Sequence, residues 1–302
     1  MCSSDLVRGV TWTVPCLAKS RRAFEDCLGF VTLDSGRVSE GCAQFWDSPR
    51  AEGCRYAVLQ PESGARVFVR LVEAPIPDDY APLRSFGWNA VEFHVRDIEG
   101  LSKRLENSPF EVIGPPRDLM DNNAVIAMQV LGPGQELLYL TEMRHEGLRR
   151  TFGQAQCEVD RAFITVLGVS DQPRTIDFYA PFAVRMNIRK QFRITGLARA
   201  HGLDPERARF DIASVVMTQA FRIETDAYPD TAVPRSVTPG LLAPGLAMVS
   251  VVVTDADKSL DWQTLRGFEG CEESMALLIG PDGEFIELLD GDRSGFDSRV
   301  YT

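Results

Sequence analysis

The stretch WNAVEFHVRDIEGLSKRLE, residues 88–106, together with AVIAMQVLGPGQELLYLTE, residues 124–142, decides the fold. Residues 88–95 alternate apolar and polar side chains, which is the period of a strand with one buried face. Asp97 is placed to cap a helix in which Ile98, Leu101 and Leu105 recur at intervals of three to four residues. The second segment carries the apolar runs of strands. The region therefore predicts a strand, a helix and further strands.

This order occurs four times along the chain. The other copies begin with predicted strands at 7–14, 161–169 and 248–253, and their helices are expected at 17–27, 175–179 and 257–265. Such repetition indicates a fold built from one supersecondary unit. Pro-rich linkers at 74–87 and 228–245 join the copies in pairs, and the charged residues 188–209 are an insertion in the third copy.

We therefore expect two paired domains. The first spans residues 1–150, with modules at about 5–75 and 86–143. The second spans residues 151–302, with modules at about 158–226 and 244–292.

Composition restricts the partners. The net charge of -11 argues against binding to a phosphate backbone, which needs clustered Lys and Arg. No apolar run approaches the roughly 18 residues that span a bilayer. Residues 1–9, MCSSDLVRG, lack the apolar core of a signal peptide, so we expect a cytoplasmic protein. The seven cysteines are scattered and show no CxxC spacing, which predicts reduced thiols and no cysteine metal site.

Five segments carry a resemblance to a known family. They are SRRAFEDCLGF (20–30), FHVRDIEGLSKRL (93–105), GVSDQPRTIDFY (168–179), VVVTDADKSL (251–260) and GPDGEFIELLD (280–290). Their order and fourfold recurrence resemble the vicinal oxygen chelate superfamily, which includes glyoxalases, bleomycin-resistance proteins and extradiol dioxygenases. The resemblance implies an α+β fold of four βαβββ modules, paired into two open, cup-shaped sheets around a small organic ligand.

The resemblance also implies where a divalent metal would bind. Family members take one ligand from the first strand and one from the last strand of each paired module. Here the first-strand positions fall on Gly9, Ala90, Ile164 and Met248, and the last-strand positions on Phe68, Leu138, Glu287 and, with a less certain alignment, Ala220. Because apolar side chains supply no metal ligands, we expect neither the family metal site nor another cofactor.

Polar residues near these positions are the candidate catalysts. Alternate residues of a strand share a face, so Glu92 and His94 face the cup if Ala90 does. A carboxylate and an imidazole so placed can act as general base and acid. The alternative is that Glu92 is exposed at the rim and His94 makes a structural hydrogen bond.

Arginines on the last strand of the first module are candidates for holding an anionic group. Arg66 and Arg70 share the face of Phe68, although Arg70 could equally pair with Glu92 or Glu136. The remaining candidate ligand-binding residues are Thr11, Thr13, Trp46, Gln129, Glu136 and Glu287.

The sequence thus favours a metal-independent lyase, isomerase or cyclase acting on a small organic molecule, with aromatic molecules among the candidates. Glu92 and His94 would transfer protons, and Arg70 would stabilise a developing oxyanion. One alternative is a non-catalytic binding protein similar to the bleomycin-resistance members. A second is a metal-dependent dioxygenase or glyoxalase with an atypical site, such as one formed by Glu92, His94 and Glu136. The expected partner is a small molecule rather than nucleic acid or membrane, and the expected state is a monomer or homodimer.

Overall fold

The structure is a computed structural model that describes residues 6–218, 221–253 and 257–291. The first module contains β1 (Leu6–Val14), α1 (Leu17–Leu28), β2 (Phe30–Arg37), α2 (Glu40–Phe45), η1 (Pro49–Ala51), β3 (Arg55–Pro61) and β4 (Phe68–Glu73). The second contains β5 (Gly87–Val95), α3 (Ile98–Leu105), β6 (Glu111–Asp118), β7 (Val125–Leu131) and β8 (Leu137–Met143). Helix α4 (Glu146–Phe152) connects it to the third module.

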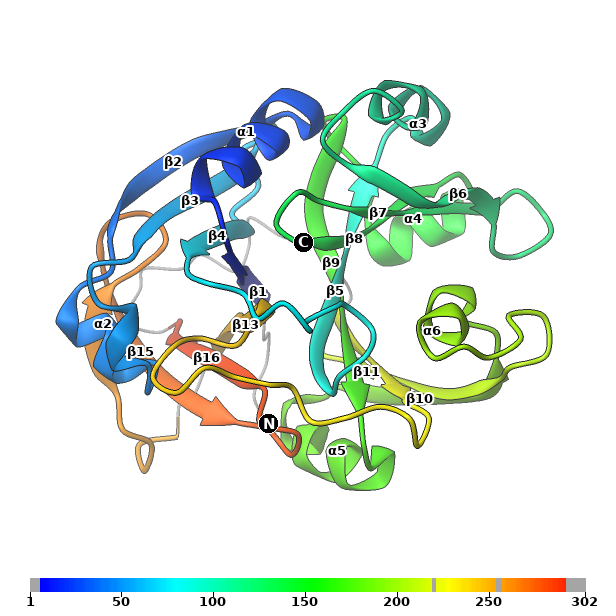
Figure 1. Cartoon of the computed structure of the whole chain (residues 1–302). Coiled ribbons are helices and arrows are strands. Elements are labelled where there is room, and N and C mark those ends of the chain that lie inside the picture. The colour runs from blue at the N-terminus through cyan, green and yellow to red at the C-terminus, as the bar shows by residue number, and fades with distance from the viewer. Residues whose placement is uncertain (1–5, 219–220, 254–256, 292–302) are drawn as a thin grey trace.

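The second half of the chain repeats this order, except that the described part of the fourth module contains no helix. The third module contains β9 (Val159–Val169), α5 (Gln172–Tyr179), η2 (Ala180–Phe182), β10 (Arg185–Phe192), α6 (Thr195–Ala200), β11 (Phe210–Val216) and β12 (Arg222–Ala227). The fourth contains β13 (Gly245–Val253), β14 (Gln263–Arg266), β15 (Glu272–Ile279) and β16 (Phe285–Asp290). The predicted α+β class, four modules and two curled sheets are confirmed (Figure 1).

Local capping explains where the predicted helices begin and end. The Asp97 side chain accepts a hydrogen bond from the Gly100 amide at the start of α3. Asp171 caps α5 in the same way, through the Arg174 amide. Gly29, with φ of 72°, ends α1 in the left-handed conformation that glycine adopts without strain.

The helix predicted at 257–265 is wrong for the residues that the structure describes there. Residues 257–262 form turns and coil, and β14 begins at Gln263. The Asp257 side chain accepts from the Ser259 amide, and its carbonyl accepts from Trp262 Nε1. These local bonds hold a turn and so compete with helix formation.

The sheets pair the modules differently from the expected pairing within 1–150 and within 151–302. One sheet has the order β14-β15-β16-β13-β1-β4-β3-β2 and joins modules one and four. The other has the order β10-β11-β12-β9-β5-β8-β7-β6 and joins modules two and three. The antiparallel ladders β1–β13 and β5–β9 make these joints. We call them the 1–4 sheet and the 2–3 sheet.

The two Pro-rich linkers run side by side where they pair with each other. Ser85 and Val233 form an isolated parallel bridge, and the Phe86 amide donates to the Val233 carbonyl at 3.0 Å. Arg235 adds a bond from Nη1 to the Leu246 carbonyl at 2.9 Å. The linkers therefore connect the β1–β13 ladder of one sheet to the β5–β9 ladder of the other.

The main core lies between the sheets. Phe24 of α1 packs against Trp12 of the 1–4 sheet, with ring centroids 6.2 Å apart, and against Phe110 at 6.1 Å. Phe30 and Phe93 meet edge to face across the same core. We call the opposite face of each sheet its concave face. No helix in the described part of the chain is long and apolar enough to cross a membrane.

Candidate functional site

A buried ion pair occupies the concave face of the 1–4 sheet. Arg70 Nη2 lies 3.0 Å from Glu287 Oε2 and 3.1 Å from Oε1. The carboxylate also accepts from Trp46 Nε1 at 3.1 Å and from Ser250 Oγ at 2.7 Å, and Arg70 Nε donates to Thr11 Oγ1 at 3.0 Å. Glu287 is completely buried and Arg70 is 5% exposed. A charge pair out of water is tolerated because hydrogen bonds satisfy both partners.

Aromatic rings close this face. The Arg70 guanidinium lies 4.7 Å from the Trp46 ring centroid and 4.5 Å from that of Phe268. Phe268 stacks on Phe68 with centroids 5.5 Å apart. A Cβ atom added to Gly9 would lie 2.6 Å from the Phe268 ring. The ring therefore fills the space beside the first-strand position where the family would place a metal ligand.

A second ion-pair cluster lies next to Phe68. Arg8, which is 3% exposed, pairs with Glu269 and Glu273, and its guanidinium is 5.1 Å from the Phe68 ring. Arg66 also pairs with Glu269. The charged residues of this face thus bind one another.

The donor set at the family's metal positions does not fit a divalent ion in either sheet. In the 1–4 sheet Gly9, Phe68 and Met248 offer no donor, and Glu287 is held by Arg70. In the 2–3 sheet Ala90 and Ile164 are apolar, Leu138 packs in the core between the sheets, and Ala220 is outside the described residues. In the described ranges no group of three or more His, Cys, Asp or Glu could hold a metal.

The concave face of the 2–3 sheet brings together carboxyl groups from two modules. Glu92 on β5 lies between Tyr139 on β8 and Ile164 on β9. On β12, Glu224 lies opposite Val166 and Asp226 lies opposite Gly168. Strand spacing puts β5 and β12 about 10 Å apart. Ile164 and Val166 thus form an apolar floor between two acidic edges.

Burial changes the protonation of these carboxyls. It raises the pKa of Glu92 to about 7, against the hydrogen bond donated by the Thr141 hydroxyl. Burial, followed by the charge of Glu224, raises the pKa of Asp226 well above its usual value. Burial therefore favours the protonated form of Asp226.

Unpartnered polar atoms gather on the same face. Tyr139 Oη, Asp226 Oδ1 and Tyr228 Oη are buried and have no hydrogen-bond partner in the described structure. The pKa of Tyr139 is raised by burial and then by the charges of Asp226, Glu224 and Glu92. Its hydroxyl is therefore near enough to these carboxyls to interact with them electrostatically. Leaving a buried polar atom unsatisfied costs about 1–3 kcal/mol. A polar ligand would satisfy these atoms.

His94 is held away from this chemistry. Its Nε2 lies 2.9 Å from the Phe152 carbonyl oxygen, and its ring stacks on Phe163 with centroids 3.9 Å apart. Burial, followed by the charge of Arg161, lowers the pKa of His94 to about 4. The imidazole is therefore neutral near pH 7 and donates a hydrogen bond to the carbonyl, which is the geometry of the structural alternative.

Helix α6, from the charged insertion, covers the 2–3 face (Figure 1). Leu197 packs with Leu83, Ala90 and Val166, which joins the helix to the linker and the sheet. His201 anchors its end, with Nδ1 2.8 Å from Thr231 Oγ1 and Nε2 2.8 Å from the Leu83 carbonyl.

The predicted catalytic set is divided between the two sheets. Glu92 and His94 lie on the 2–3 sheet, whereas Arg70 lies on the 1–4 sheet and pairs with Glu287 rather than with Glu92 or Glu136. Of the predicted ligand-binding residues, Thr11, Thr13, Trp46 and Glu287 belong to the 1–4 half and Arg66 to its rim, and Gln129 lies beside Gly196 of α6.

Glu136 lies elsewhere, in the turn between β7 and β8. Its carboxylate is completely buried and accepts from the Gly134 amide at 2.7 Å. The atypical metal set of Glu92, His94 and Glu136 is therefore not brought together.

Sequence reasoning missed Tyr139, Asp226 and Tyr228. Their signal is the alternation in RIETDAY, residues 222–228, where every second residue from Arg222 onward is polar or aromatic. In LLYLTE, residues 137–142, Tyr139 and Thr141 share the face of Glu92 by the same rule.

Comparisons with solved structures identify the fold. A point mutant of glyoxalase I from Zea mays aligns with a TM-score of 0.63 and 17% identity, over 96% of this chain and 93% of that one. The glyoxalase I structure from Zea mays itself gives 0.60 and 17% over the same shares. A putative dioxygenase from Bacillus subtilis subsp. subtilis str. 168 gives 0.56 and 11%, over 97% and 87%. No protein-family model and no curated protein sequence matches the chain.

Proposed function

We propose that this chain, which has the fold of the vicinal oxygen chelate superfamily, binds a small organic molecule on the concave face of the 2–3 sheet and moves protons on it. One observation carries the proposal. Glu92, with a pKa of about 7, lies beside Tyr139, whose buried hydroxyl has no partner in the described structure. A base is most effective when its pKa is near the working pH.

The arrangement suits a metal-independent lyase or isomerase. The Glu92 carboxylate takes a proton from a carbon next to a carbonyl group, and the Tyr139 hydroxyl donates a hydrogen bond to the oxygen as it gains charge. An isomerase returns the proton to a neighbouring carbon, whereas a lyase expels a leaving group that Asp226, as a protonated acid, can protonate. The apolar floor of Ile164 and Val166 favours a flat, aromatic substrate.

The location and state of the protein complete the proposal. The seven scattered cysteines, which the sequence predicts to be reduced thiols, favour the cytoplasm. Because four modules already complete both sheets, a monomer is sufficient, and a homodimer is the alternative.

Two observations favour a second candidate, a binding protein without catalysis. His94 is held by the Phe152 carbonyl and Arg70 by Glu287, so two of the three predicted catalytic groups are engaged. Helix α6 covers an apolar face that could enclose a ligand without changing it.

The experiment uses 5-nitrobenzisoxazole as a general probe of a base in an apolar site. Removal of the proton from C3, the only C–H of its isoxazole ring, forms the nitrile, breaks the N–O bond and releases a coloured cyanonitrophenolate. The wild-type protein should accelerate this elimination beyond an equal concentration of acetate, and Glu92→Gln should lower the rate at least a hundredfold. Equilibrium dialysis measures probe binding in parallel.

The matched control is Glu106→Gln, an equal change at an exposed residue that follows α3. It should keep the wild-type rate. Equal rates for the wild type and Glu92→Gln would contradict the role of Glu92. Binding of the probe without acceleration would support the binding protein instead.

A further inference from the structure

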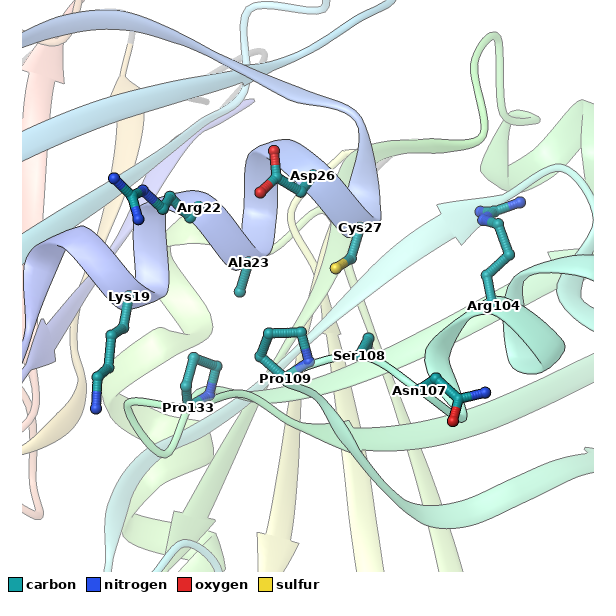
Figure 2. Close-up of a pocket in the computed structure, with 10 residues that line it drawn as sticks. All are labelled: Lys19, Arg22, Ala23, Asp26, Cys27, Arg104, Asn107, Ser108, Pro109 and Pro133. Atoms are coloured by element: carbon teal, nitrogen blue, oxygen red, sulfur yellow. The ribbon is translucent and has the colours of Figure 1, made fainter.

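A cleft lies on the outer side of the molecule, away from both concave faces. Its volume is about 590 Å³, within the range of small-molecule sites. Helix α1 of the first module forms one wall, and the segment after α3 with the β7–β8 turn of the second module forms the other (Figure 2). Its lining residues are Lys19, Arg22, Ala23, Asp26, Cys27, Arg104, Asn107, Ser108, Pro109 and Pro133.

Helical spacing gives the α1 wall a mixed surface. Lys19, Ala23 and Cys27 are four residues apart and share one stripe of the helix. Figure 2 shows Ala23 and Cys27 directed toward Pro109 on the opposite wall, and Lys19 extending toward Pro133. The middle of the cleft is therefore apolar, and a cation stands at one end.

The walls are fixed by the packing beneath them. Phe24 of α1 and Phe110 of the opposite wall meet with ring centroids 6.1 Å apart. The Ser108 hydroxyl donates to the Leu105 carbonyl at 2.9 Å, which holds the segment at the end of α3. The buried carboxylate of Glu136 binds the Gly134 amide and so fixes the turn that carries Pro133. The cleft is preformed, which lowers the entropic cost of binding.

The charges of the cleft select an anion. Arg104 pairs with Glu158, whereas the ranges that the structure describes contain no ion-pair partner for Lys19 or Arg22. The one acidic lining residue, Asp26, points away from Pro109 in Figure 2. In a chain with net charge -11, this is a local excess of positive charge.

We propose that this cleft is a second binding site, for a small organic anion with an apolar body. The body lies on Ala23 and Pro109, and its acidic group meets Lys19, with Arg22 adding charge at the rim. The site does not depend on the proposed catalysis at Glu92, because it is built from α1 and the α3–β6 segment rather than from the concave face of the 2–3 sheet.

The test uses 1-anilinonaphthalene-8-sulfonate, an apolar dye with one negative charge, followed by its fluorescence. We expect saturable binding that weakens with salt and becomes about tenfold weaker in Lys19→Glu. The matched control is Lys258→Glu, the same charge reversal at an exposed residue of the fourth module. It should change the affinity less than twofold.

Alkylation by iodoacetamide locates the bound dye. The Cys27 thiol lines the cleft, whereas Cys271 is exposed elsewhere and serves as the internal reference. Saturating dye should slow the alkylation of Cys27 and leave that of Cys271 unchanged, as measured by mass spectrometry of peptides. Equal dye affinities in the two lysine variants, or unprotected Cys27, would overturn the proposal. The Glu92→Gln variant should bind the dye with wild-type affinity and show the same protection of Cys27. This outcome separates the cleft from the proposed function.

Discussion

The two concave faces start from the same fold but differ in how their carboxyl groups are paired. On the 1–4 sheet, Arg70, Glu287, Trp46 and Thr11 satisfy one another, and Phe268 fills the remaining space. On the 2–3 sheet, the Tyr139 and Tyr228 hydroxyls and one oxygen of Asp226 are buried without partners in the described structure, and on the 1–4 sheet the same holds for Thr13 Oγ1 and Arg8 Nη1. Of these atoms, only that of Asp226 belongs to a carboxyl group.

The difference bears on which face is the better candidate for a bound ligand. Buried polar groups are normally hydrogen-bonded, because leaving them unpaired costs stability. A face whose polar groups bind one another has little left to offer a ligand. A face that bears the cost of unpaired groups is the better place to look for a bound molecule.

The largest expected effect is on the 1–4 sheet. Arg70→Met leaves the completely buried Glu287 without its cation and should lower the free energy of unfolding by about 3–5 kcal/mol, measured by urea denaturation. The double variant Arg70→Met, Glu287→Leu removes both charges and should regain most of that loss. A loss below about 1 kcal/mol in the single variant would show that this face is not held by the ion pair.

The next prediction concerns Glu92 and pH. Burial raises its pKa from 4.5 to about 7, so the folded state binds the proton more tightly than the unfolded state. The tighter proton binding stabilises the folded state. This stabilisation is complete below about pH 4.5 and is lost as the pH rises through 7. Wild-type protein should therefore lose about 2 kcal/mol relative to Glu92→Gln between these pH values, allowing for partial exposure to solvent.

Urea midpoints across the pH range measure this difference. The elimination rate of 5-nitrobenzisoxazole should move in the opposite direction and rise about tenfold from pH 6 to pH 8 as Glu92 ionises. Parallel stability curves for the wild type and Glu92→Gln would contradict the raised pKa.

His94→Gln distinguishes a structural imidazole from a catalytic one. The substitution should cost about 1–2 kcal/mol, because the bond to the Phe152 carbonyl and the stacking on Phe163 are lost. The pKa of His94 is lowered to about 4, so its contribution is present above about pH 6.5 and lost as the pH falls through 4. The elimination rate should stay within about threefold of wild type. A hundredfold lower rate in the folded variant would instead restore His94 as a catalyst.

The smallest effects compare two hydroxyl deletions. Thr11→Val removes the acceptor of Arg70 Nε and should cost about 1 kcal/mol. Tyr139→Phe removes a hydroxyl without a partner in the described structure and should leave the stability unchanged or raise it by up to about 1 kcal/mol. Thermal unfolding of both variants measures the contrast. Equal losses would mean that the two faces do not differ in this respect.

Much of the fold could be predicted from the sequence because its signals are local. The alternation at 88–95 and the cap at Asp97 determine β5 and α3 whatever their surroundings. The pairing of modules is not a local property. Each first strand is nearly fully buried, and nothing in β1 distinguishes β13 from β5 as a partner.

The site was harder to predict for the same reason. Face-sharing along β5 gave Glu92 from the sequence, and the structure places it on the concave face. Which residues surround Glu92, however, depends on which strands lie next to β5. Asp226 comes near Tyr139 only because β9 lies between β12 and β5 in the 2–3 sheet, with β8 on the other side of β5. The prediction that Arg70 acts with Glu92 rested on a pairing of modules one and two that the strands do not make.

The interleaved strand order also bears on how the chain is made. A ribosome releases residues 1–73 long before residues 245–290, yet β1 needs β13 as its neighbour. Modules two and three can assemble as soon as β12 emerges, while the first module waits with an unpaired strand edge, a template for aggregation. Nascent chains just long enough to expose residue 230 outside the ribosome should thus hold a folded middle and an N-terminal segment that needs a chaperone.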